Sequence, residues 1–192
     1  MPRRMVAVTN ILSPISQSIL IHYNLSMNQF PGNQFNKETE DAIFFSTPVF
    51  YALDNFSAHI VEIWGKKFQT SEHAYQWKKF ADSNPEIAQE IFSATSPNQV
   101  KKISDAHKAE VSSIFHNLKV EIMEEILRAK VNQHEKVKRI LKESGTKMII
   151  ENSPLDNFWG AGHDGKGENV LGKLWMKVRD SQNLNSDSST SN

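Results

Sequence analysis

The chain of 192 residues contains no cysteine and no long apolar segment, and its basic and acidic side chains balance to a formal net charge of zero. Without cysteine the protein forms no disulfide bond and has no thiolate to act as nucleophile or metal ligand. No apolar run approaches the roughly 18 residues that a membrane-spanning helix needs. Zero net charge argues against general binding to nucleic acid or to a membrane surface, because both usually need a basic bias. We expect a cytoplasmic protein without a membrane partner.

Several common catalytic and metal-binding patterns are also missing. The seven histidines show no H-E-x-x-H spacing, which with the lack of cysteine argues against a zinc site. The segment "DGKGEN" lacks the D-x-D-x-D-G spacing of an EF-hand, and no G-x-S-x-G motif is present. We expect no metal and no cofactor.

The length fits one domain with a sizeable core. Residues 1–40 mix a broken apolar stretch with a polar linker, which predicts a loosely ordered N-terminal extension. Residues 182–192 are rich in Ser and Asn and predict a disordered tail. The folded domain is therefore expected over residues 41–181.

The domain is predicted to be α+β and predominantly helical, a single globular domain with a small antiparallel β element. "AIFFSTPVF" predicts a strand ended by Pro48, Gly65 a hairpin turn, and "KMIIEN" a second short strand. Helices are expected to begin after Thr70 or Ser71, and at Pro85 and Pro97. Strands and helices do not alternate as they do in a parallel α/β fold.

Three further helices show apolar stripes typical of a buried face. The first helix carries Leu118, Ile122 and Ile126, widened by Phe115, Met123 and Leu127. The next helix ends at Gly145 and turns inward Val137, Ile140 and Leu141. The last helix, which Asn169 is expected to cap, turns inward Leu171, Leu174, Trp175 and Val178.

The segment "TSEHAYQWKKF" places polar side chains on one helix face. Glu72, Gln76 and Lys79 follow one another at i, i+4 and i+7. Two structural explanations stay open, because a first-turn Glu commonly stabilises the helix dipole and a lysine is commonly a solvated surface residue. The alternative is a polar site on this face.

The segment "SPLDNFWGAGHDGKGEN", residues 153–169, contains four glycines within eight residues, Gly160 to Gly167. Glycine lets backbone N–H groups approach a ligand closely, an arrangement that favours phosphate and other anions. Trp159 is suited to stacking on a flat heterocycle. The alternative is a structural turn in which Trp159 fills the core.

The two segments together, with other motifs in order, resemble the YbiA-like, or NADAR, family. The motifs are Phe44-Phe45, "LDNF" from Leu53, "WGKKFQTSEHAYQ" from Trp64, Lys79-Phe80, "LRAK" from Leu127 and "SPLDNFWGAGHDGKGENVLGKLWMKVR" from Ser153. The likeness covers about Phe44 to Arg179, most of the predicted domain.

The resemblance implies hydrolysis of an N-glycosidic bond, with no metal required. One branch of the family hydrolyses ribosylaminopyrimidine phosphates, early intermediates of riboflavin biosynthesis, and so disposes of reactive metabolites. Another branch removes ADP-ribose from modified guanine, so that modified nucleic acid is the alternative substrate. The expected partner is a small phosphoribosyl or ADP-ribosyl substrate. A third hypothesis is a nucleotide- or ADP-ribose-binding module that has lost catalysis.

The resemblance also implies roles for individual residues, since N-glycoside cleavage passes through a ribosyl cation-like transition state. Glu72 would stabilise that charge or activate water, and Asp164 or Asp156 would protonate the departing nitrogen. Lys79 would hold a phosphate or the leaving base; alternatively, its uncharged amine would attack the anomeric carbon and form a Schiff base.

Trp159 would stack on the base while the backbone of residues 160–167 cradles the phosphate. The expected catalytic residues are Glu72, Lys79 and Asp164. The expected substrate-binding residues are Trp159, Gly160, Gly162, Gly165, Gly167, Asn169, Gln76, Asn157 and Phe115.

The chain departs from the family pattern ahead of its longest helix. Ile114-Phe115 stands where an Asp-Trp pair is expected, and no Arg follows Ala106. Phe115 still offers a ring for stacking, and His107 or Lys108 is a candidate to replace the Arg. These departures bear on the choice of substrate more than on the type of reaction.

Overall fold

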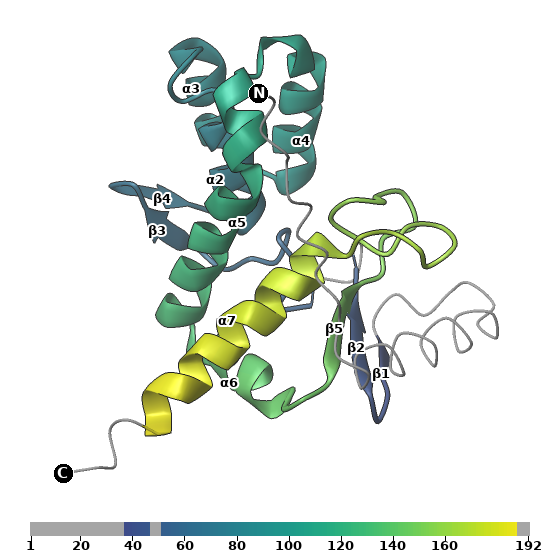
Figure 1. Cartoon of the computed structure of the whole chain (residues 1–192). Helices are drawn as coiled ribbons and strands as arrows, with labels where there is room; N and C mark the ends of the chain where they lie inside the picture. The colour runs from purple at the N-terminus through teal and green to yellow at the C-terminus, as the bar shows by residue number, and fades with distance from the viewer. Residues whose placement is uncertain (1–36, 47–50, 188–192) are drawn as a thin grey trace, which may run out of the picture.

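The computed structural model describes residues 37–46 and 51–187, in which helices lie between two small sheets (Figure 1). This arrangement confirms the predicted α+β, predominantly helical fold. The elements are β1 (Lys37–Glu38), β2 (Ala42–Phe45), β3 (Val61–Ile63), β4 (Lys66–Phe68), α2 (Ser71–Lys78), α3 (Pro85–Ser93), α4 (Pro97–Ala106), a 3-10 turn (Lys108–Glu110), α5 (Ser113–Gln133), α6 (Glu135–Glu143), β5 (Met148–Glu151) and α7 (Val170–Asp187).

The predicted boundaries fall partly outside the described residues. Residues 1–36, Pro48 and residues 188–192 lie outside them. β1 belongs to the segment predicted as an extension, and α7 continues to Asp187, past the predicted domain end at residue 181.

The larger sheet has the strand order β1-β2-β5 and contains one parallel pair. β1 runs antiparallel to β2, whereas β2 runs parallel to β5, with Phe45 opposite Glu151. We predicted only antiparallel pairing, and that was wrong for β2 and β5. Parallel strands need a long crossover, and here the helices of residues 46–147 supply it.

The predicted hairpin is confirmed as β3 and β4. Its two turn residues, Trp64 and Gly65, both have positive φ, 53° and 70°. A two-residue turn of this kind matches the twist of the strands it joins.

Side-chain caps set the start of four helices, and the sequence predicts the start of three of them, α2, α3 and α4. Thr70, Asn84, Ser96 and Ser112 each accept a hydrogen bond from the backbone N–H three residues later. Asn169 was expected to cap α7; it does precede the helix, and its carbonyl accepts from Lys173 N–H (3.0 Å), but its side chain does not act as the cap. Asn169 has a φ of 50°, and its side chain bonds to β5 instead, accepting from Glu151 N–H (2.9 Å) and donating to the Ile149 carbonyl (2.9 Å).

The main core lies between α5, α7 and β5, with α2 at one end. The predicted inward residues of α7, which are Leu171, Leu174, Trp175 and Val178, are all buried. A second cluster joins α2, α3 and α4 through Phe80, Ile87, Ile91 and Val100.

Leu118 is the exception among the predicted core residues, because its exposed fraction is 46%. The neighbouring residues of α5 show which face of the helix packs against the rest of the protein at this point. Phe115 packs against Tyr75, and Lys119 lies over the ring of Phe158. Leu118 falls on the flank of the helix beside these contacts.

Lys130 on α5 is fully buried and organises residues 52–57. Its Nζ donates to the Asp54 carbonyl and to Ser57 Oγ, both at 2.8 Å. The Asn55 carbonyl of this segment accepts from the N–H of Glu72 (3.0 Å). The buried lysine therefore supports the segment on which the first turn of α2 rests.

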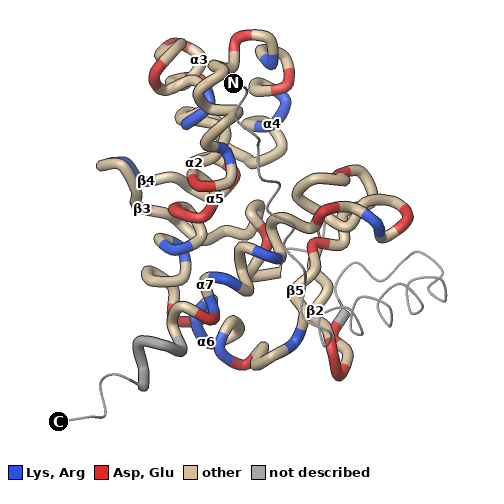
Figure 2. Tube along the Cα trace, viewed as in Figure 1, with Lys and Arg blue, Asp and Glu red and all other residues tan. Residues whose placement is uncertain are grey.

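Acidic and basic residues are interspersed along the described chain (Figure 2). Within residues 37–46 and 51–187 no helix combines the length and the apolar character that crossing a membrane requires.

Candidate active site

Glu72 occupies the first turn of α2 and is almost entirely buried, with 7% of its surface exposed. Gln76, one turn later, donates from Nε2 to Glu72 Oε1 at 2.7 Å. Burial raises the pKa of Glu72, while the hydrogen bond from Gln76 and the charge of Lys79 oppose that rise. A carboxylate placed in this way is a candidate base, because burial brings its pKa towards neutral pH.

Lys79 directly follows α2 and is half-buried. Its Nζ lies 5.3 Å from the centre of the Tyr75 ring and donates to Ser104 Oγ on α4 at 3.4 Å. Burial lowers the pKa of Lys79, and the Glu72 carboxylate partly restores it. The structure therefore brings Glu72, Gln76 and Lys79 together on one side of α2.

Tyr75 connects α2 to the glycine loop, residues 153–169. Its ring meets Trp159 edge-on at a centroid distance of 5.5 Å and meets Phe115 at 5.3 Å. Trp159 is partly exposed and also contacts Phe158 at 5.0 Å. Phe115 is buried behind Tyr75, with 5% exposed, so that it supports this aromatic group from the core side.

The glycine loop packs backbone against backbone after β5 (Figure 1). A Cβ at Gly167 would lie 2.4 Å from the Gly160 carbonyl oxygen, and one at Gly162 would lie 2.0 Å from Asn157 Oδ1. Gly162 and Gly165 also have positive φ, 71° and 72°. Side chains are therefore excluded from these positions by the packing of the loop itself.

Several of the loop's backbone N–H groups, including those of two glycines predicted to bind substrate, donate to acceptors inside the loop. Gly167 N–H donates to the Ala161 carbonyl (2.7 Å), and Gly165 N–H donates to the Gly162 carbonyl (3.4 Å). Asn157 is exposed, and the Asn169 side chain is occupied by β5. The predicted binding residues of the loop thus include several whose polar groups already have partners within the protein.

Asp164 and Asp156, the predicted acids, are both engaged in turns. Asp164 is exposed; its Oδ1 accepts from Lys166 N–H (3.1 Å), and its Oδ2 lies 3.7 Å from Lys166 Nζ. Asp156 Oδ1 accepts from the N–H groups of Phe158 (2.9 Å) and Trp159 (2.7 Å). Asp156 therefore orients Trp159, and Asp164 faces solvent.

Glu151, the last residue of β5, is a further carboxyl at this site that sequence reasoning missed. Its Oε2 is buried and has no hydrogen-bond partner within the described part of the chain. Burial, together with repulsion from Asp156, Asp54 and Glu72, raises the pKa of Glu151 to about 8. The sequence does contain a signal for this residue, because Glu151 is an acidic residue that ends an apolar strand just before the glycine loop.

The departures from the family pattern lie at the edge of this region. Ile114 is 68% exposed, and His107 Nδ1 lies 2.7 Å from Glu110 Oε1. Lys101 on α4 is close enough to influence the charge of both Glu72 and Lys79. Lys101 is exposed and its Nζ lies 3.4 Å from Asp105 Oδ2, and His107 is likewise paired with a neighbouring carboxylate.

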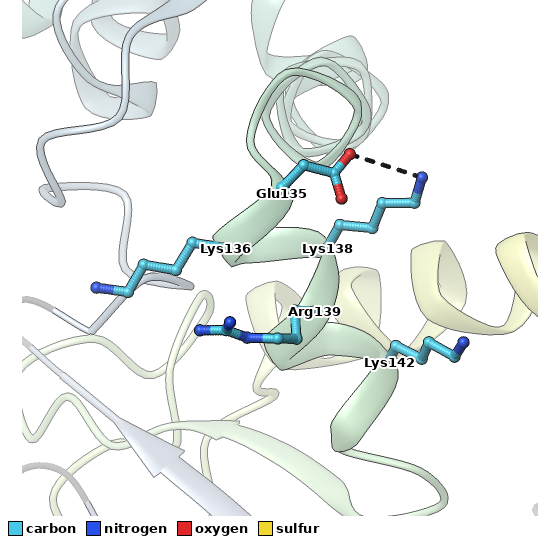
Figure 3. A pocket seen from close by; sticks show the side chains of 5 residues that line it. All are labelled: Glu135, Lys136, Lys138, Arg139 and Lys142. Carbon is cyan, nitrogen blue, oxygen red and sulfur yellow. Dashed lines mark ion pairs between the residues drawn. The ribbon is translucent and has the colours of Figure 1, made fainter.

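A hollow on the surface lies away from this site, on α6. Figure 3 shows that its lining side chains all come from that helix, namely Glu135, Lys136, Lys138, Arg139 and Lys142. It shares no residue with the group formed by α2, Tyr75, Trp159 and Glu151.

Comparison with known proteins identifies the family. The NADAR domain model matches residues 34–182. N-glycosidase YbiA of Escherichia coli is 32% identical over 138 residues, 71% of this chain and 85% of that protein. The riboflavin biosynthesis protein PYRR of Zea mays is 31% identical over 156 residues, 74% of this chain and 25% of that protein. The solution NMR structure of Escherichia coli YbiA aligns with a TM-score of 0.69 at 28% identity, covering 79% of this chain and 90% of that chain. With most of its length matched by the family model and its fold shared with YbiA, the chain belongs to the NADAR domain family.

Proposed function

We propose that the protein is an N-glycosidase that hydrolyses the bond between C1′ of a phosphorylated ribose and the amino nitrogen of a pyrimidine. The observation that carries this proposal is the buried carboxylate of Glu72, with Lys79 near it, Tyr75 beside Lys79, and Trp159 packed against Tyr75. A relative named as a riboflavin biosynthesis protein supports a substrate of that pathway.

Glu72 has the properties that cleavage of an N-glycoside needs at the sugar. As C1′ separates from nitrogen, positive charge develops on the ribose, and a carboxylate stabilises that charge. The same carboxylate accepts a proton from the group that attacks C1′. The hydrogen bond from Gln76 favours the ionised form in which Glu72 does both.

Two roles for Lys79 fit its surroundings. Its charged form supplies positive charge for a substrate phosphate. Its uncharged form, which burial favours, is a nucleophile that attacks C1′ and forms a Schiff base after ring opening. In the second case Lys101, also near Glu72, remains to meet the phosphate charge.

Trp159 supplies the flat surface for the base. Its backbone N–H is held by Asp156 and its ring by Tyr75, so its orientation is set before substrate arrives. Such preorganisation reduces the entropy lost on binding. The glycine loop, of which Trp159 is part, is itself tightly packed.

The test is a side-by-side turnover assay read by mass spectrometry. Wild-type protein, Glu72→Gln and the control Glu90→Gln, which alters an exposed acid of α3, are incubated with 5-amino-6-(ribosylamino)uracil phosphate and with ADP-ribosylated guanosine. We expect wild type and control to release the pyrimidine from the first compound and Glu72→Gln to release none.

Each other outcome is informative. Cleavage of only the guanosine compound would move the substrate to the ADP-ribosyl branch while keeping the bond type. Absence of cleavage of both by the wild type would overturn the proposed activity. Loss of folding in Glu72→Gln, seen by thermal melting, would make Glu72 a structural residue of the first turn.

A further inference from the structure

We infer that Glu151 is the acid that protonates the departing nitrogen in this reaction. The inference rests on the proposed function, which otherwise leaves this role unfilled. Asp164 is exposed beside Lys166, and Asp156 already accepts two backbone hydrogen bonds.

The alternation of β5 directs Glu151 towards the site. Ile149 is part of the main core together with Tyr75, whereas Ile150 packs in a separate cluster on the other face with Phe44. Side chains two residues apart in a strand share a face. Glu151 therefore shares the face of Ile149, and its partner in the parallel register, Phe45, belongs to the same main core.

The backbone of Glu151 is fixed from both sides. Its N–H donates to Asn169 Oδ1 (2.9 Å), and its carbonyl accepts from Ala161 N–H (2.8 Å). Gly160 lies so close that a Cβ there would be 3.0 Å from the Glu151 carbonyl oxygen. The middle and the end of the glycine loop thus hold the backbone of Glu151 in place, as a catalytic acid requires.

The side chain is set up to hold a proton. Oε2 is enclosed and lacks a hydrogen-bond partner among the described residues, a condition that is costly for a carboxylate and milder for a carboxylic acid. Three other carboxylates, those of Asp156, Asp54 and Glu72, lie near enough to disfavour its ionisation. With a pKa of about 8, Glu151 is largely protonated at neutral pH. Burial raises the pKa of Glu72 as well, but Glu72, unlike Glu151, has a hydrogen bond from Gln76 and the nearby charge of Lys79 that oppose this rise.

The reaction then balances. The C1′–N bond breaks, its electron pair passes to nitrogen, and the Glu151 carboxyl gives its proton to that nitrogen. Glu72 accepts a proton from the group that attacks C1′, and over the whole turnover one water molecule is added across the bond. Exchange with solvent returns a proton to Glu151 and removes one from Glu72.

The test compares wild type with Glu151→Gln and Glu151→Asp on 5-amino-6-(ribosylamino)uracil phosphate between pH 6 and pH 9.5. Glu168→Gln, an exposed acid of the same loop, is the matched control. General acid catalysis contributes about 10²- to 10⁴-fold, so we expect kcat of Glu151→Gln to fall by at least about 100-fold with little change in KM. In the wild type kcat/KM should decline above pH 8; Glu151→Gln should lose this decline and Glu151→Asp should keep it.

Three results separate the possibilities. A wild type active on the substrate, with Glu151→Gln as active as Glu168→Gln, would overturn the role of Glu151 and leave the N-glycosidase proposal intact. A wild type without turnover would overturn the proposed function itself. If Glu151→Gln fails to fold, Glu151→Asp is the deciding variant. Its side chain is shorter by one methylene, so the carboxyl group lies farther from the substrate. An unchanged kcat in Glu151→Asp would therefore contradict proton donation by Glu151.

Discussion

Gln76 Nε2 donates to Glu72 Oε1 across one turn of α2, at 2.7 Å, and both side chains are buried. The hydrogen bond favours the ionised form of Glu72 against the burial that opposes it. Gln76 Oε1, in contrast, has no partner within the described residues. The Nε2 group of this amide therefore opposes the rise that burial causes in the pKa of Glu72.

Gln76→Met is expected to shift the acidic side of the pH–activity profile to higher pH. Loss of the hydrogen bond raises the pKa of Glu72 further, so that a higher pH is needed to ionise the base. We expect turnover on the acidic side to fall on the order of tenfold, as for loss of a charge-assisted hydrogen bond, and to recover as pH rises. Gln89→Met, on the exposed face of α3, is the control. An unchanged profile would exclude Glu72 as the ionising base.

Lys79→Arg distinguishes the two roles of Lys79. Arginine keeps the positive charge but does not lose its proton in proteins, whereas burial favours the uncharged amine of Lys79. We expect a loss of turnover of at least about 100-fold. We also expect borohydride to trap a sugar adduct on Lys79 in the wild type. Lys78→Arg is the control. If Lys79→Arg keeps its activity and the wild type forms no adduct, Lys79 acts only through its positive charge and not as a nucleophile.

Local patterns in the sequence carried the predictions that the structure confirms. The Thr70 cap, the Gly65 turn and the buried stripe of α7 depend on residues within a few positions of one another. The common face of Glu72, Gln76 and Lys79 follows from helix geometry alone. These features need no knowledge of the tertiary fold.

The wrong or missed features depend on contacts between distant segments. The parallel pairing of β2 with β5 joins two strands that are separated in the sequence by most of the helices. Asn169 looked like a helix cap because its use by β5 is a tertiary contact. Glu151 looked like an ordinary strand-end acid, because only the folded glycine loop and the neighbouring carboxylates give it its environment.

Lys130 should make stability depend on pH above neutrality. Burial lowers the pKa of Lys130 to about 7 in the folded protein, whereas the unfolded chain has the ordinary value of 10.5. Between these values the unfolded state binds more protons, so the free energy of unfolding rises with pH. Urea unfolding at pH 7 and pH 9 should show a rise of about 2 kcal/mol in the wild type relative to Lys130→Met. Lys142→Met, on the exposed face of α6, should behave as the wild type. A difference independent of pH would mean that Lys130 stays charged when buried.

Gly172→Ala should destabilise the protein by forcing α7 away from β5. A Cβ at this position would lie 2.0 Å from the Ile149 carbonyl oxygen, a backbone atom that cannot rotate away. Overpacking of this kind typically costs about 1–3 kcal/mol, so the urea midpoint should fall. Lys173→Ala, one residue later and exposed, should stay within about 0.5 kcal/mol of the wild type. Because Ile149 precedes Glu151 by two residues, turnover should fall as well, even under conditions where the variant remains folded. A variant with wild-type stability and turnover would show that the contact between α7 and β5 is loose, and the fixed position of Glu151 would lose its support.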